Sequence, residues 1–153
     1  MKRNRLLLML LACTLLLGAC GAPAVKTPAL SLQETVEKAL NGQAGLVAFD
    51  LMDLVDITGM DETQIAECVY LTSADGLSAE EVIALRCTDK KHTPQVKQLL
   101  EGYLAQRLRE TQNYLPDVYA VLKDAKVQVK NSTVLLATGA QAGAWEKAIL
   151  AGE

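Results

Sequence analysis

The sequence predicts an α+β fold, in which helices pack mainly on one face of an antiparallel or mixed sheet of about four strands. Two observations predict this fold. In some segments apolar residues recur at intervals of three and four, whereas other segments alternate or are rich in β-branched residues. The β-prone segments also come in neighbouring pairs separated by turn residues, as in antiparallel hairpins. The expected order is helix, two strands, two helices, two strands and a final helix.

The first helix is predicted from a capping box. Ser31 and Glu34 have the required spacing, and Leu32, Val36 and Leu40 then recur at intervals of four. We expect this helix to end near residues 41–42, an Asn-Gly pair, because both residues favour helix termination.

The next part of the chain contains the first pair of strands. The apolar residues within 46–60 fit neither the helical nor the strand period, and this segment is interpreted as a short strand or a helical turn. Residues 65–73 and 81–88 are rich in Val, Ile, Tyr and Thr, and residues 74–76 (Ala-Asp-Gly) are typical of a turn or longer loop between strands. Residues 78–81 have capping-box spacing, so a helix is an alternative interpretation there, but the β-branched pair that follows favours a strand.

The longest predicted helix follows this pair. Thr93 is a suitable N-cap and Pro94 suits the first helical position. The core-facing stripe extends to about Gln112 and contains Val96, Leu99, Leu100, Tyr103, Leu104 and Leu108. Pro116 opens a second, shorter helix.

A hairpin and a terminal helix complete the predicted order. Residues 126–130 alternate strictly between polar and apolar side chains. Residues 131–132 (Asn-Ser) can turn the chain, and residues 133–138 are β-prone. Ala144, Ala148 and Ile149 then place the last helix near the end of the sequence.

Residues 1–19 have the parts of an export signal. Basic residues lie within residues 2–5, residues 6–17 form a mostly apolar run, and Gly18 and Ala19 are the small residues that a signal peptidase requires. The apolar run would measure about 18 Å as a helix, too short for a hydrocarbon core of about 30 Å. We therefore expect an export signal that is removed.

The segment Leu17-Gly18-Ala19-Cys20 resembles the processing box of a bacterial lipoprotein. The resemblance implies cleavage before Cys20 and a diacylglyceryl group on its thiol, which would hold the protein on the extracytoplasmic face of the cell membrane. The alternative is an ordinary secretory cut near Ala19, which would leave Cys20 a free thiol. Residues 20–30, with two prolines and no amphipathic period, are expected to form a tether, and residues 31–153 a single domain.

The charge of the exported part disfavours nucleic acid as a partner. Residues 1–19 hold three of the 15 Lys and Arg residues and no acid, which leaves 12 basic and 18 acidic residues and a formal net charge of −6. The same balance gives no reason to expect electrostatic binding to anionic lipid. We therefore expect membrane contact through the lipid alone.

Cys68 and Cys87 are the cysteines that remain, because Cys13 leaves with the signal and Cys20 is acylated. They lie in neighbouring predicted strands of an exported protein, so a disulfide between them is one interpretation. The other is a pair of small apolar core residues.

Metal and catalytic signatures are weak. His92 is the single histidine and has lysines beside it, so we expect a solvated loop residue and no cofactor. The acids at 50, 53, 56, 61 and 62 lack EF-hand spacing and are interpreted as a solvated surface. A nucleophile motif such as Gly-x-Ser-x-Gly is absent from the sequence, so we expect no enzyme.

Tyr114, Pro116 and Tyr119 are the candidate surface for an envelope protein partner. Two tyrosines that flank a proline can form a small aromatic face. The alternative is that they pack over the end of the long helix and fix the corner between two helices. Trp145 has the same two interpretations.

Several segments together resemble a family of small bacterial lipoproteins, domain of unknown function 4358. The similarity covers about residues 34–150, and its motifs are Ser73-Ala-Asp-Gly-Leu-Ser-Ala-Glu-Glu-Val-Ile-Ala-Leu, Leu104-Ala-Gln-Arg-Leu-Arg, Tyr114-Leu-Pro-Asp-Val-Tyr and Val134-Leu-Leu. The resemblance implies an exported, lipid-anchored domain, mostly of monoderm bacteria, without an assigned reaction or catalytic residues. It also implies a glycine in the turn where this chain has Asn131-Ser132.

The expected role is a binding or accessory module at the cell envelope. The alternative is an envelope hydrolase that uses carboxylate chemistry. A deep cleft with two convergent acids would favour the hydrolase, whereas a closed domain with an exposed apolar patch would favour the binding module.

Overall fold

The computed structural model describes residues 30–43 and 45–153. The predicted signal, Cys20 and nearly all of the predicted tether lie outside the described residues.

The sheet is antiparallel throughout and has five strands in the order β1-β2-β3-β5-β4. The strands are β1 (Leu46–Phe49), β2 (Ile65–Ser73), β3 (Glu81–Cys87), β4 (Gln128–Lys130) and β5 (Thr133–Thr138). The α+β prediction is confirmed, with β1 as an additional strand. The segment that fitted neither period holds both β1 and helix α3 (Leu51–Thr58), which meet at Asp50.

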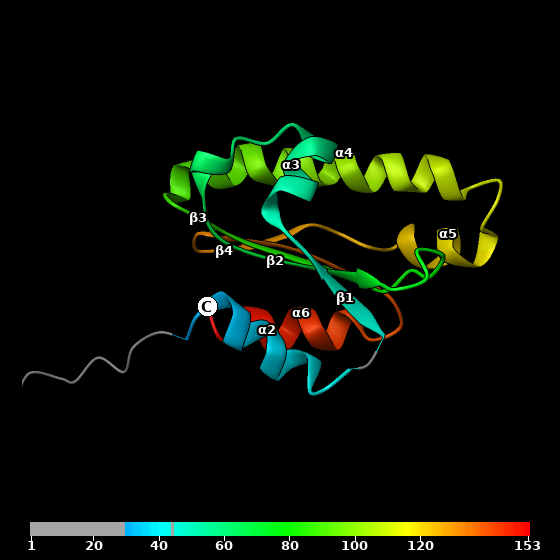
Figure 1. Cartoon of the computed structure of the whole chain (residues 1–153), viewed down its shortest axis with the longest axis horizontal. Coiled ribbons are helices and arrows are strands. Elements are labelled where there is room, and N and C mark those ends of the chain that lie inside the picture. Colours follow the sequence, from blue (N-terminus) through cyan, green and yellow to red (C-terminus); the bar gives the residue numbers. More distant parts are fainter. Residues whose placement is uncertain (1–29, 44) are drawn as a thin grey trace, which may run out of the picture.

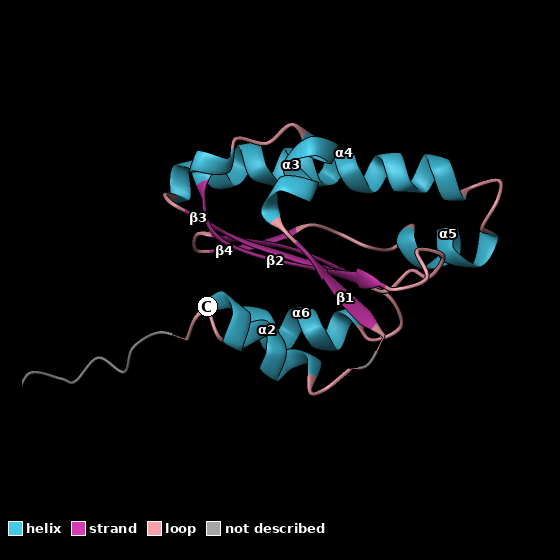
Figure 2. Ribbon diagram, viewed as in Figure 1, coloured by secondary structure: helices cyan, strands magenta, loops and turns pink. Residues whose placement is uncertain are grey.

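Helices cover both faces of the sheet, so the expectation of helices mainly on one face is wrong. Figures 1 and 2 show α2 (Leu32–Leu40) and α6 (Ala142–Ala151) on one side, and α3 and α4 (Thr93–Thr111) on the other. The short helix α5 (Pro116–Leu122) lies at one end. The physical reason is that β3 and β5 are buried along nearly their whole length, and strands with continuous apolar runs need cover on both faces.

Alternate residues of the central strands point to opposite faces of the sheet and pack into two separate cores. Ile83 and Leu85 pack with Leu100 and other α4 residues, and Leu122 of α5 joins this core. The second core, between the sheet and the α2/α6 pair, contains Leu32, Val36, Val82, Ala84, Leu135, Ala137, Trp145 and Ile149. Trp145 is 2% exposed, as its core interpretation expects.

Two element boundaries differ in detail from the prediction. Thr93 is the first residue of α4, and His92, at the end of a short 3-10 helix (Lys90–His92), takes the capping position. The β4–β5 turn has Asn131 at a φ of 52°, in the left-handed region that asparagine tolerates better than most residues. The hairpin register pairs Lys130 with Thr133, so Asn131 takes the positive φ that a glycine would otherwise supply.

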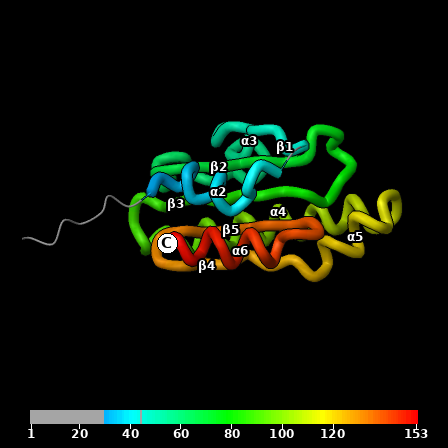
Figure 3. Tube along the Cα trace, turned by 90° about the horizontal axis from the view of Figure 1, so that it is seen from below, coloured from blue at the N-terminus to red at the C-terminus, as the bar shows by residue number. Residues whose placement is uncertain are grey.

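The start of α2 and Glu153 lie at the same end of the molecule. The Leu32 N–H donates to Glu67 Oε2 at 2.6 Å, and Glu67 pairs with Arg86. Arg86 Nη2 in turn donates to Glu153 Oε1 at 2.6 Å. The α4–α5 corner and the β2–β3 loop lie at the opposite end of the long axis in both Figure 1 and Figure 3.

Candidate functional site

The end of the molecule opposite Leu30 exposes apolar side chains from separate parts of the chain. Tyr114 in the α4–α5 corner is 84% exposed, Leu77 in the β2–β3 loop is 62% exposed and Val121 of α5 is 39% exposed. We call these three residues the distal apolar residues. The segments that hold them, which are the α4–α5 corner, the β2–β3 loop and α5, lie at the opposite end of the long axis from the start of α2 (Figure 1).

The three candidate partner residues differ in exposure. Tyr114 and Pro116 are exposed, whereas Tyr119 is half-buried. The Tyr114 ring therefore does not pack over the end of α4. The backbone N–H of Tyr119 donates to the Leu115 carbonyl at 2.9 Å at the start of α5. Tyr114 is the residue of this group that a partner can reach most fully.

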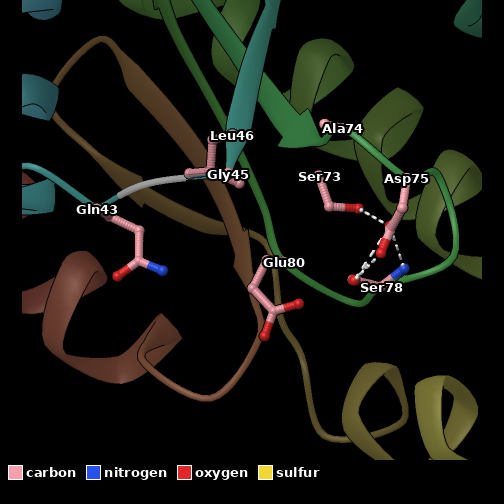
Figure 4. A pocket seen from close by; sticks show the side chains of 8 residues that line it. All are labelled: Gln43, Gly45, Leu46, Ser73, Ala74, Asp75, Ser78 and Glu80. Atoms are coloured by element: carbon pink, nitrogen blue, oxygen red, sulfur yellow. Dashed lines mark hydrogen bonds between the residues drawn. The ribbon is translucent and has the colours of Figure 1, made fainter.

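A pocket of about 310 Å³ opens at the same end (Figure 4). The α2–β1 loop, the beginning of β1 and the β2–β3 loop form its walls. The lining residues are Gln43, Gly45, Leu46, Ser73, Ala74, Asp75, Ser78 and Glu80. A second pocket of about 240 Å³ lies between α5 and the start of α6, and its Gly139 lies against Glu80 of the first pocket.

The Asp75 carboxylate stabilises the β2–β3 loop through hydrogen bonds within it. Its Oδ1 accepts from the Leu77 and Ser78 N–H groups at 2.9 and 3.0 Å and from Ser73 Oγ at 2.9 Å. Ser78 Oγ donates to Oδ2 at 3.0 Å. These bonds, the Leu77 N–H first, lower the pKa of Asp75 to about 2, so the carboxylate stays ionised and cannot serve as a general acid near neutral pH.

Asp75 and Glu80 do not form a convergent pair of acids. In Figure 4 the Asp75 carboxylate faces Ser73 and Ser78 of its own loop, while Glu80 projects from the other side of the pocket. Glycoside hydrolysis requires two carboxyl groups that flank one bond, with one of them able to give a proton. The pocket therefore offers no support for the hydrolase alternative.

Cys68 and Cys87 are free thiols in the structure. Cys68 is opposite Leu85 in the β2–β3 register, and Cys87 is opposite Ile65, so the two cysteines are diagonal neighbours. Diagonal neighbours are about 7–8 Å apart, beyond the usual Cα separation in a disulfide. Both contribute to the core under α4, as the apolar interpretation of this pair expects.

The acids at 50, 53 and 61 form helix caps. Asp50 and Asp53 accept from each other's backbone N–H in a reciprocal capping box at the start of α3, and Asp61 accepts from the Thr63 N–H at 3.0 Å. Their spacing is a capping-box signal that the sequence interpretation missed. Within residues 30–43 and 45–153, three or more His, Cys, Asp or Glu residues nowhere gather as metal ligands.

A buried polar network between the sheet and α4 was also missed. Glu81, 1% exposed, accepts from Tyr103 Oη and Arg107 Nη1, both at 2.6 Å. Tyr103 and Tyr70 hydroxyls lie 3.4 Å apart. Burial raises the pKa of Glu81 although Arg107 and Tyr103 oppose the shift, and burial also raises the pKa of Tyr103. The i, i+4 spacing of Tyr103 and Arg107 on one helix face was the available signal.

The family model described as Domain of unknown function (DUF4358) matches residues 38–139. The chain belongs to this family. The match runs from within α2 to the end of β5, so it includes the whole sheet and α3 to α5 but not α6. Neither the curated proteins nor the solved structures contain a match to the chain. No helix within the described part of this DUF4358 member is long and apolar enough to span a membrane.

Proposed function

We propose that this DUF4358 protein is an exported lipoprotein, held on the extracytoplasmic face of the cell membrane by lipid on Cys20. Its domain would serve as a binding or accessory module for an envelope protein. The observation that carries the proposal is the position of the distal apolar residues, at the end of the domain opposite Leu30. The segment Leu17-Gly18-Ala19-Cys20 supports the anchor.

The two ends of the domain suit two different tasks. Residues 20–30 span at most roughly 40 Å when fully extended, at about 3.3–3.6 Å per residue. An anchor on Cys20 would therefore keep the Leu30 end nearest the membrane. The opposite end, with Tyr114 and Leu77, would face outward, where another envelope protein can reach it.

The anchor is tested by metabolic labelling with a clickable fatty acid. Label is expected on the wild-type protein and should be lost in Cys20→Ala, because the thiol is the only attachment point that the processing box offers. Cys68→Ala is the matched control, since it removes a thiol from the folded domain and should keep the label. Label that persists in Cys20→Ala would contradict the proposed anchor.

The partner surface is tested by photo-crosslinking on intact cells. A photo-reactive phenylalanine analogue in place of Tyr114 should capture a reproducible neighbouring protein, because this side chain is 84% exposed. The same analogue at Gln33, exposed near the start of α2, is the control and should not capture that neighbour. Equal capture at both positions, or none at Tyr114, would count against the distal end as the binding surface.

A further inference from the structure

Strand β1 is an edge of the sheet, and on its outer side no other strand of residues 30–43 and 45–153 pairs with it. The Ala74 N–H donates to the Gly45 carbonyl at 3.0 Å, while the Ser73 N–H donates to Glu80 at 3.1 Å on the other side of β2. Alternate residues of an antiparallel strand bond to opposite neighbours. Val47 and Phe49 therefore bond to β2, and Leu46 and Ala48 direct their N–H and C=O groups to the free edge.

The side chains at this edge are apolar and exposed. Val47 is 40% and Phe49 45% exposed, and both lie on the α3/α4 face, where the Phe49 ring packs against the Tyr70 ring at a tilt of 40° with centroids 5.4 Å apart. Met52 in the first turn of α3 is 48% exposed. An unpaired edge with exposed apolar side chains is the surface to which an added strand binds, through backbone hydrogen bonds and alternate side chains.

Acidic side chains follow β1 in the sequence. Asp50, Asp53 and Asp56 follow β1 directly, and the sequence has no Lys or Arg between Lys38 and Arg86. The acids lie close enough to act on β2. Burial, together with the Asp50 charge, raises the pKa of Cys68 to about 11. Burial also raises the pKa of Tyr70; Glu81 and Asp53 add to this shift, whereas the Tyr103 hydroxyl and Arg107 oppose it.

The acidic residues determine which kind of partner the apolar edge favours: a second copy of the chain, a lipid bilayer or a basic segment. A second copy of the chain would bring two sets of aspartates to the same edge, and like charges across an interface are unfavourable. An anionic bilayer would be repelled for the same reason. A cationic strand is attracted instead.

We propose that the free edge of β1 binds an extended basic peptide segment, in which Lys or Arg alternates with apolar residues, as an added strand. The apolar residues would contact Val47 and Phe49, and the basic residues would lie near Asp50 and Asp53. This site is separate from the distal apolar residues and does not depend on lipid at Cys20, so it can fail or succeed independently of the proposed function.

The test uses a fluorescein-labelled peptide of eight residues that alternates valine and lysine. It is titrated with the full-length chain in non-ionic detergent, and binding is followed by fluorescence anisotropy. We expect saturable binding that weakens as salt is added, because salt screens exposed charges. A peptide with glutamate in place of lysine should not bind. Equal binding of both peptides would overturn the proposal.

Ala48→Pro tests the backbone hydrogen bonds. Proline removes the outward N–H and is tolerated where the N–H of an edge strand faces solvent. It should weaken binding about five- to tenfold, in line with the loss of one hydrogen bond and a poorer fit. Ala48→Val, which keeps the N–H, is the matched control and should bind as the wild type does. Unchanged binding to folded Ala48→Pro would overturn strand addition.

Two further measurements keep the test decisive if Ala48→Pro unfolds. A peptide with N-methyl groups on alternate residues removes the hydrogen bonds from the ligand side and should not bind the wild type. Asp50→Asn removes a charge but keeps the N-cap, because Asn caps helices as well as Asp does. It should weaken binding about threefold, as expected for an exposed charge pair. Full binding in both measurements would rule out the proposed site.

Discussion

Asp75 shows how one side chain can determine the form of a loop. Its carboxylate accepts hydrogen bonds from two backbone N–H groups and two serine hydroxyls between Ser73 and Ser78. A loop organised in this way holds Leu77 in a defined place, although the Leu77 side chain itself is exposed. The residue therefore contributes to the candidate binding end through geometry and not through direct contact.

The carboxyl group of Asp75 should titrate with a pKa of about 2, below its ordinary value of 3.8. The folded state then binds this proton less readily than the unfolded state. The contribution of Asp75 to stability should be complete above about pH 4 and should be lost as the pH falls toward 2. Carbon-13 NMR of the side-chain carboxyl measures the midpoint directly. A midpoint near 3.8 would show that the loop hydrogen bonds are not formed.

At the scale of elements, the junction between β5 and α6 depends on a glycine. Gly139 has a φ of 109°, where side chains are strained. A Cβ atom there would lie 2.9 Å from Glu80 Cγ and 3.1 Å from Glu80 Cα. Gly139 thus allows the chain to turn from the sheet into α6 against the β2–β3 loop.

Gly139→Ala should destabilise the protein by about 2 kcal/mol, because it adds backbone strain and a contact with the Glu80 backbone. Gly143→Ala is the matched control within α6, where a Cβ meets nothing within 4 Å. It should stabilise the protein by up to about 1 kcal/mol, since alanine favours a helix over glycine. Urea denaturation measures both free energies of unfolding. Changes of the same sign in the two variants would contradict this account.

Elements also differ in how well their sequences predict them. Helix α4 and the strand pair β2–β3 were predicted because each runs long enough to show its period. Strand β1 and helix α3 are harder to predict, because Asp50 follows the last residue of β1 and caps α3, so neither the strand nor the helix period continues for long. The cover on both faces of the sheet was signalled only by the apolar runs of β3 and β5.

At the scale of the whole molecule, the Glu81 network joins the longest helix to the centre of the sheet. Arg107 and Tyr103 of α4 both donate to Glu81 at the start of β3. A buried carboxylate is costly without such partners, whereas a complete network also restricts how α4 can sit on the sheet.

Arg107→Met should destabilise the protein by about 3 kcal/mol at pH 7, because Glu81 would stay buried with its charge uncompensated. Burial already raises the pKa of Glu81, and the loss of Arg107 removes the charge that opposes this shift. A group with a raised folded-state pKa favours folding when protonated, so the deficit should shrink as the pH is lowered from 7 to 5. Urea denaturation at the two pH values measures this change.

Arg109→Met is the control for this prediction. Arg109 lies two residues further along α4, is exposed and forms no ion pair among the described residues. Its replacement should change the free energy of unfolding by no more than about 0.5 kcal/mol. If Arg107→Met lowers the free energy of unfolding by the same amount at pH 7 and pH 5, the charge on Glu81 is not the cause of the destabilisation.

Part of the candidate site was accessible from sequence. Tyr114 was selected by residue type and position, and the structure places it at 84% exposure. The sequence does not show that Leu77 lies at the same end as Tyr114. The β2–β3 loop and the α4–α5 corner are far apart in the sequence, and only the folded domain places both at one end of its long axis. Glu81 could not be recognised as buried, since its partners come from α4.

The sequence by itself determined the α+β class, most of the helices and strands, and the acidic charge balance of the chain. These properties depend on local periodicity, capping and composition, which neighbouring residues specify. Only the tertiary structure decided the strand order, the helices on both faces, the distal apolar residues and the free edge of β1. Those properties depend on which distant segments bury one another's apolar faces, and that competition involves the whole chain at once.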